Sequence, residues 1–162
     1  PRFQAVRGAA RGRAPADLLD IGTGRGAFLW PFLEAFPHVR VTCAEILEHR
    51  RAMLRAVSCG GIGRLTVVDA DGSRLPLADD SFDVSTALEV LEHQADPAPM
   101  AGELLRVSRR FVLASVPSRP DDNPEHLQLF TDRSLKSLFL DRGAASVSVS
   151  HVPGHLVAVI RT

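Results

Sequence analysis

The chain has 162 residues, enough for one domain that buries about 70% of the surface of the unfolded chain. Apolar residues make up 45% and charged residues 23%, a globular composition that excludes a disordered chain. The net charge is zero, so the total charge gives no attraction for nucleic acid or for an anionic membrane. No apolar run approaches the roughly 20 residues of a membrane span.

The only two cysteines, Cys43 and Cys59, have the spacing of neither a disulfide framework nor a zinc site. We expect both to be reduced and to act as small apolar fillers. With no signal-peptide pattern, the chain reads as cytoplasmic, and its arginine- and alanine-rich composition is typical of a bacterial protein.

Short apolar runs alternate along the chain with segments of helical period. We expect residues 1–16 to form a basic N-terminal tail and residues 17–162 a single domain. Strands are predicted at 17–21, 40–44, 65–69, 83–88 and 111–116, and helices at 27–36, 46–57, 99–107 and 133–141. Pro31 must lie in the first turn of its helix or kink it, and Thr131 is the expected N-cap of the last helix.

The C-terminal segment has a different pattern. Residues 145–152 and 155–160 alternate in period 2 around Pro153 and Gly154, which predicts a hairpin. The whole pattern predicts an α/β fold: a doubly wound, Rossmann-like sheet of about seven strands, mostly parallel with an antiparallel C-terminal hairpin, and helices on both faces. Ligands of such sheets bind beyond the carboxyl ends of the strands, so functional residues should directly follow strands.

A glycine-rich turn, with the sequence DIGTGRG, follows the first predicted strand and precedes a helix. Glycine allows a tight turn and a close approach of a ligand to the main chain. Gly22, Gly24 and Ala27 also satisfy the dinucleotide pattern, so an NAD site is an alternative. However, Asp20 would repel a pyrophosphate and suits a ligand with an amino group better. Glu45 ends the second strand, where a carboxylate can accept hydrogen bonds from both ribose hydroxyls.

Four motifs resemble one known family. They are LDIGTGRG from Leu19, DGSRLPLADDSFD from Asp71, LEVLEH from Leu88 and ELLRV from Glu103. Together they are similar to the class I S-adenosylmethionine-dependent methyltransferases, in the subgroup called methyltransferase type 11. The resemblance extends from Asp17 to about Gly143, and nicotinamide dehydrogenases do not share these motifs.

The resemblance implies S-adenosylmethionine as cofactor, with S-adenosylhomocysteine as product. Asp20 would meet the methionine amino group, Glu45 the ribose and Asp71 the adenine amino group, while Ile46 would pack on the adenine face and Leu88 would face the methionine portion. The family usually has aspartate in place of this glutamate and alanine in place of the glycine after Asp71. The residues implied for cofactor binding are Asp20, Gly22, Thr23, Gly24, Gly26, Glu45, Ile46, Asp71, Gly72 and Leu88.

Methyl transfer from a sulfonium depends mainly on positioning, and a general base is needed only for an acceptor that is protonated. The candidate catalytic residues are His93, His126 and Glu92. No metal is assigned, although Glu89, Glu92, His93 and His126 could hold a divalent ion. The E-x-x-E-H group is similar to one in ubiquinone-biosynthesis O-methyltransferases and, with a downstream histidine, to one in small-RNA 2′-O-methyltransferases, where it binds metal.

The remaining histidines, His38, His49, His151 and His155, are expected to be ordinary solvated side chains, and Phe28 and Trp30 to belong to the core. Few residues are available for a lid, so we expect an open site. Either the acceptor is large, or a partner subunit, a second copy of the chain or an N-terminal segment covers the site.

The expected function is methyl transfer to an oxygen or nitrogen of a small-molecule acceptor, without a membrane partner. The alternatives are an RNA or protein methyltransferase and a non-catalytic cofactor-binding subunit, and nucleic acid is not excluded as a partner. An NAD oxidoreductase has only the glycine turn in its favour.

Overall fold

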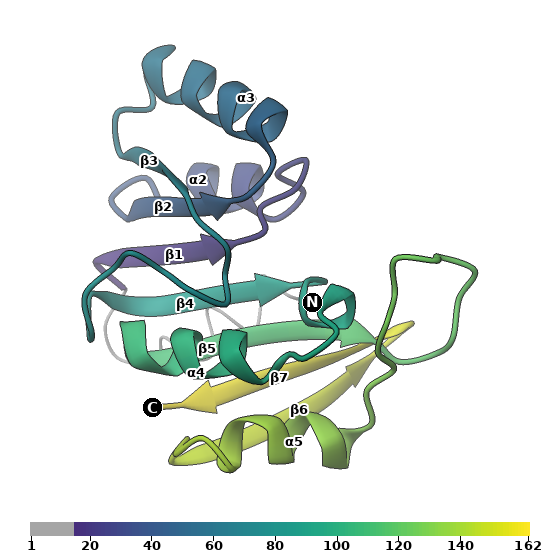
Figure 1. The fold of residues 1–162 in the computed structure, drawn as a ribbon. Helices are drawn as coiled ribbons and strands as arrows, with labels where there is room; N and C mark the ends of the chain where they lie inside the picture. The colour runs from purple at the N-terminus through teal and green to yellow at the C-terminus, as the bar shows by residue number, and fades with distance from the viewer. Residues whose placement is uncertain (1–14) are drawn as a thin grey trace.

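The computed structural model describes residues 15–162, and its centre is one seven-stranded sheet (Figure 1). The basic residues expected in the N-terminal tail, Arg2, Arg7, Arg11 and Arg13, lie outside the described residues. The strand order is β3-β2-β1-β4-β5-β7-β6. The strands are β1 (Asp17–Ile21), β2 (Arg40–Glu45), β3 (Leu65–Asp69), β4 (Phe82–Leu88), β5 (Ser108–Pro117), β6 (Ser146–Val152) and β7 (His155–Arg161).

The first five strands pair in parallel, and β7 lies antiparallel between β5 and β6. The predicted mixed sheet with its C-terminal hairpin is therefore confirmed. The chain passes outward from β1 to β2 and β3, and then returns to place β4 on the other side of β1. The strand order thus reverses between β1 and β4, and ligands bind at such a reversal in open α/β sheets.

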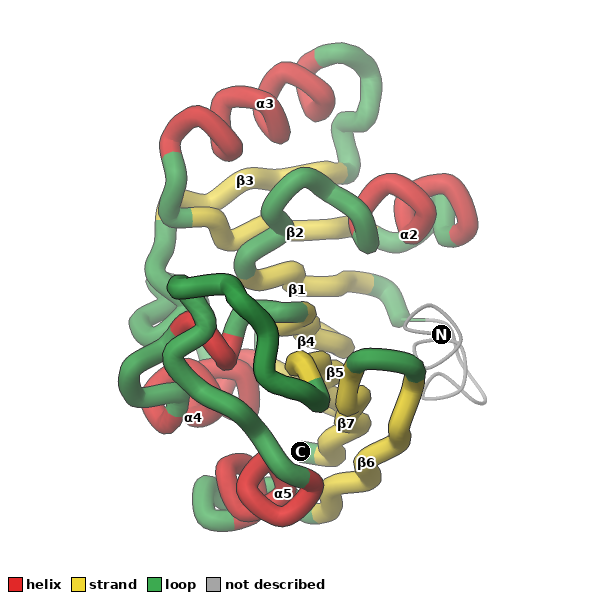
Figure 2. The backbone as a smooth tube through the Cα atoms, turned by 90° about the vertical axis from the view of Figure 1, so that its right-hand side faces the viewer, coloured by secondary structure: helices red, strands yellow, loops and turns green. Residues whose placement is uncertain are grey.

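The helices lie on both faces of the sheet (Figure 2), as predicted. Their bounds are α2 (Leu29–Ala35), α3 (Glu48–Cys59), α4 (Ala98–Val107) and α5 (Asp132–Leu140), with a short 3₁₀ helix, η1 (Leu91–His93), after β4. Neighbouring residues of β1 enter opposite cores. Leu18 packs with the side chains of α2 and α3, whereas Leu19 packs with those of α4 and α5. Among the helices of residues 15–162, none is long and apolar enough to cross a membrane.

Several helix ends follow from local chemistry. Thr131 is the N-cap of α5, as predicted: its Oγ1 accepts a hydrogen bond from the Ser134 amide at 3.1 Å, and a capping box forms. Pro31 lies in the first turn of α2, where its missing N–H has no cost. The expected start of this helix at Ala27 is wrong, because the glycine turn continues as turns up to Phe28.

The expected start of the next helix at Ile46 is also wrong, since α3 begins at Glu48. The Leu47 amide donates instead to the Glu45 carboxylate, and Arg51 donates to the carbonyls of Glu45 and Ile46. These bonds keep Ile46 and Leu47 out of the helix. Cys43 is buried as expected, whereas Cys59 is exposed at the end of α3 and is not a core filler.

Candidate functional site

A cavity of about 210 Å³ lies at the carboxyl ends of β1, β2 and β3. Glu45 is the last residue of β2, and Asp71 follows β3 by two residues. Both carboxylates therefore reach the same edge of the sheet, beside the glycine turn. The residues that line the cavity are Ile21, Gly22, Ala44, Glu45, Ile46, Ala70, Asp71, Gly72, Val90, Gln94 and Met100.

The glycine turn requires glycine at three positions. Gly22, Gly24 and Gly26 have φ of 64°, 60° and 79°, in the left-handed region that other residues rarely adopt. At Gly22 there is also no room, because an added Cβ would lie 2.7 Å from a methyl carbon of Val90. The turn thus needs glycine both for its backbone conformation and for the close contact above it.

Glu45 is only 2% exposed, yet its carboxylate is held at the cavity by backbone amides. One oxygen accepts from the Leu47 amide at 3.0 Å, and the other accepts from the Gly24 amide at 3.3 Å. Arg50 adds an ion pair at 3.9 Å. These partners fix the carboxylate between the glycine turn and the end of β2.

Asp71 and Ile46 form the more open side of the cavity. Asp71 is exposed, and one of its carboxylate oxygens accepts from the Ser73 amide at 2.9 Å, which fixes the turn after β3. Ile46 lies at the mouth of the cavity and is 60% exposed, a large exposed fraction for an aliphatic side chain. At Gly72 an added Cβ would lie 2.6 Å from Ile21 and 2.7 Å from Met100, so the backbone there approaches its neighbours closely.

Asp20 lies behind this cavity and does not line it. It is 3% exposed, and its carboxylate accepts a hydrogen bond from the Thr86 hydroxyl on β4 at 2.6 Å. Burial raises its pKa from the ordinary 3.8 to about 6, against the opposing effect of the hydrogen bonds from Thr86 and Thr23. The Thr23 hydroxyl is also 3.5 Å from the Asp20 carbonyl oxygen. Asp20 is therefore a buried carboxylate with a perturbed pKa, directly below the glycine turn.

Leu88, which the family resemblance assigned to the methionine portion, packs against the core on the α2 side and is not a lining residue. Val90, Gln94 and Met100 line the cavity instead. Sequence reasoning missed these three residues, although Val90 follows β4 by two residues, at the edge where such residues are expected. Their apolar and amide side chains carry no distinctive chemical signal.

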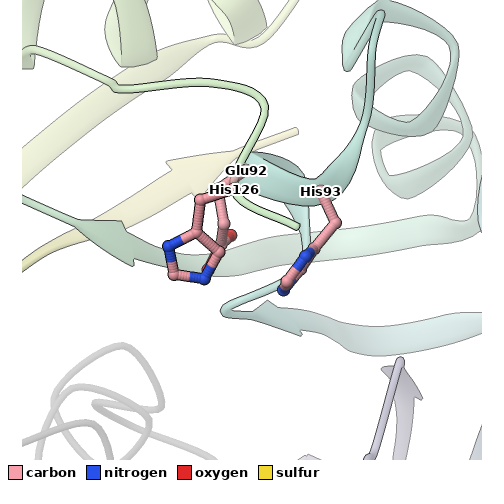
Figure 3. Close-up of side chains that lie close together, drawn as sticks. All are labelled: Glu92, His93 and His126. Carbon is pink, nitrogen blue, oxygen red and sulfur yellow. The ribbon is translucent and has the colours of Figure 1, made fainter. Parts of the chain in front are cut away.

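The three candidate catalytic residues lie close together (Figure 3). Glu92 and His93 belong to η1, and His126 belongs to the loop after β5. One potential ligand atom from each residue lies within 4.8 Å of the other two. The two imidazole rings are 4.9 Å apart between centroids and meet edge to face.

Glu89 does not join this group, which corrects the expectation of a four-residue set. Its backbone has a φ of 59°, and its side chain reaches β5 and β7. There its carboxylate accepts from the Ser115 hydroxyl at 2.6 Å and lies 3.0 Å from Nδ1 of His155. His155 is therefore a partly buried, paired histidine, and the expectation of an ordinary solvated side chain is wrong. His151 is exposed as expected, with Nε2 2.8 Å from Asp132.

A larger cavity of about 530 Å³ lies elsewhere on the carboxyl edge, between the start of α5 and the β6–β7 hairpin. Its lining includes Phe130, Pro153 and Leu156, and none of the residues assigned to the cofactor. Volume alone would favour this cavity. The chemistry favours the smaller one, because the two carboxylates and the glycine turn meet there.

Comparison with known proteins agrees with this geometry. A family described as a methyltransferase domain matches residues 19–111, more than half of the chain. An uncharacterized methyltransferase of Mycolicibacterium vanbaalenii is 37% identical over 102 residues, which are 63% of this chain and 38% of the relative. A malonyl-[acyl-carrier protein] O-methyltransferase of Geobacter sulfurreducens is 35% identical over 75 residues, which are 46% of this chain and 28% of that protein.

The fold is likewise similar to that of a solved methyltransferase structure. The crystal structure of an S-adenosylmethionine-dependent methyltransferase from Aquifex aeolicus matches with a TM-score of 0.77 at 17% identity, over 99% of this chain and 88% of that one. The present chain spans less than half the length of the curated relatives described above. Its motifs, sheet order and family match lead to one conclusion: the chain belongs to the methyltransferase domain family, among the class I S-adenosylmethionine-dependent methyltransferases.

Proposed function

We propose that this chain binds S-adenosylmethionine, the methyl donor of its family, in the 210 Å³ cavity and directs the methyl group to an oxygen or nitrogen of an acceptor. The observation that carries the proposal is the meeting of Glu45, Asp71 and Ile46 at one cavity beside the point where the strand order reverses. Because the chain covers only part of its relatives, the activity is proposed for this domain.

The residues present suit the adenosine part of the cofactor. The Glu45 carboxylate, fixed by two backbone amides, can accept hydrogen bonds from the two ribose hydroxyls. The Asp71 carboxylate can accept from the adenine amino group, and the exposed Ile46 can cover an apolar ring face. Gly72 lines the cavity, and its close packing against Ile21 and Met100 leaves no room for a side chain at this position.

The methionine part requires a small movement. A cavity of 210 Å³ is below the roughly 300 Å³ at which ligand pockets begin, so the adenosine portion fits better than the whole cofactor. Val90 packs on Gly22, where the methionine portion is expected. We propose that Val90 moves away when the cofactor binds, which brings the ammonium group toward the Asp20 carboxylate.

Bound S-adenosylmethionine supplies an electrophilic methyl group on a sulfonium. The protein then needs to hold the acceptor in line with that group and to exclude water, and both tasks depend on positioning. Glu92, His93 and His126 follow β4 and β5 at the same edge, and we propose that they face the acceptor. A histidine there can take a proton from an acceptor that carries one at working pH.

We propose a small-molecule acceptor, because zero net charge gives no general attraction for RNA. An RNA or protein acceptor and a non-catalytic, cofactor-binding subunit are the alternatives that the experiment must separate. We also propose that a partner subunit or a second copy of the chain covers the open site.

The test is transfer of labelled methyl groups from S-adenosylmethionine into separate pools of small metabolites, RNA and protein. Label in the metabolite pool, lost in the Glu45→Gln variant, is the expected result. Label in RNA or protein alone would overturn the acceptor class. Tight binding of S-adenosylhomocysteine without transfer to any pool would favour the non-catalytic subunit.

A further inference from the structure

We propose that Glu92, His93 and His126 form a binding site for one divalent transition-metal ion. Their potential ligand atoms lie within 4.8 Å of one another (Figure 3). Ligands about 2.1 Å from a tetrahedral ion are about 3.4 Å apart. The most widely separated of the three ligand atoms therefore need to approach by up to about 1.4 Å, which side-chain rotations can supply.

Both imidazoles can offer Nε2 as a metal ligand. Nδ1 of His93 lies 2.9 Å from the Glu125 carbonyl oxygen, which can only accept, so this nitrogen carries the proton. Nδ1 of His126 lies 2.9 Å from the Asp121 carboxylate and is likewise the donor. In a neutral imidazole the other nitrogen, Nε2, then keeps its lone pair. A metal-binding histidine almost always donates its other ring N–H to a carbonyl or a carboxylate in this way.

The backbone holds the two segments of the site together. The amides of Leu127 and Gln128 both donate to the Glu92 carbonyl oxygen, at 2.8 and 3.1 Å. The Gln128 side chain donates to the Ala95 carbonyl at 3.0 Å. The loop that carries His126 is thus fixed to η1, and the ligand set does not depend on a mobile segment.

The ligand types indicate which ion binds. Two imidazoles and one carboxylate suit Zn²⁺ or Mn²⁺ better than Ca²⁺, which takes six to eight oxygen ligands. The Glu92 carboxylate is completely buried, and low dielectric surroundings strengthen its attraction for a cation. Glu89 contributes no ligand, because its carboxylate is bound to Ser115 and His155.

Three protein ligands leave at least one position on the ion for water or another oxygen. Val90 and Gln94, which flank η1, both line the proposed cofactor cavity, so the ion would lie next to it. If the proposed function holds, the open position faces the acceptor, and the ion selects acceptors that offer an oxygen ligand. The binding site itself is independent of that function.

The test is calorimetric titration of the metal-free full chain with Zn²⁺, and separately with Mn²⁺, at pH 7.5. One ion per chain is expected. His93→Ala and His126→Ala should each weaken binding at least tenfold. Asp121→Asn, which changes only the partner of a ligand, should weaken it about 10- to 100-fold.

The matched control is His151→Gln, because His151 also pairs with an aspartate, Asp132, but lies outside the site. This variant should bind the ion as the unchanged chain does. Absence of a one-to-one site, or an equal loss in His151→Gln and His126→Ala, would overturn the proposal. Circular dichroism without metal shows that each variant is folded. Binding of S-adenosylhomocysteine, measured separately, distinguishes failure of the metal site from failure of the proposed function.

Discussion

Replacing Asp20 with asparagine should stabilise the fold at neutral pH. Burial raises the pKa of Asp20 from 3.8 to about 6, so the folded chain holds its proton over a pH range in which the unfolded chain has released it. The free energy of unfolding therefore falls as the pH rises from about 4 to about 6, and the loss is complete above that range. A difference of about 2 in pKa corresponds to about 3 kcal/mol, at about 1.36 kcal/mol per unit.

The Asp20→Asn variant lacks this titration but keeps an oxygen that can accept from Thr86. The free energy of unfolding of the variant minus that of the unchanged chain should therefore rise by up to about 3 kcal/mol between pH 4 and pH 8. Urea unfolding at both pH values measures the difference, and the exposed Asp71→Asn serves as control. A stability difference that stays constant between pH 4 and pH 8 would show that the pKa of Asp20 is not raised in the folded chain.

The same substitution should weaken binding of S-adenosylhomocysteine. A hydrogen-bonded charge contributes about 1.5 to 3 kcal/mol, so the loss should be about 10- to 150-fold at pH 8. In the unchanged chain the affinity should rise with pH through about 6, as Asp20 ionises, and this rise should be absent from the variant. Equal affinity of the two proteins at pH 8 would contradict the proposed contact with the ammonium group.

Three further substitutions test the ribose contact, the glycine turn and the cap of α5. Glu45→Gln should weaken binding of S-adenosylhomocysteine about tenfold or more in calorimetry, because a charged acceptor for the ribose is lost; an unchanged affinity would remove Glu45 from the site. Gly22→Ala should destabilise the fold by at least about 1–2 kcal/mol in urea unfolding and abolish cofactor binding, because of its φ of 64° and the contact with Val90; a fully stable, binding-competent variant would show that the turn needs no glycine. Thr131→Ala should cost about 1 kcal/mol of stability and leave cofactor affinity unchanged, since it removes only the cap of α5; a lower affinity would link this helix to the site.

The sequence was sufficient to predict the sheet and its C-terminal hairpin, because apolar periodicity is a local signal. The start of α3 could not be predicted in the same way. Ile46 is compatible with a helix, but the carboxylate of Glu45 and the guanidinium of Arg51 take up the backbone groups at this point. Such bonds depend on the positions of side chains in the folded chain, and propensity cannot reveal them.

The sequence could predict the site residues that lie at or just after the ends of strands. Glu45 and Asp71 share a cavity because neighbouring parallel strands end at the same edge. Glu89 itself has a positive φ, and its carboxylate pairs with His155, which is 66 residues away in the sequence. The spacing of E-x-x-E-H gives no indication of either, so the sequence placed Glu89 with Glu92 and missed its pairing with His155.

The most direct test of the cofactor assignment is calorimetry of the full chain with S-adenosylhomocysteine and, in a parallel titration, with NAD. We expect S-adenosylhomocysteine to bind with one-to-one stoichiometry, Asp71→Asn to weaken this binding, and NAD to give no binding heat. Binding of NAD alone would rule out the cofactor assignment and would show that the glycine turn serves a dinucleotide.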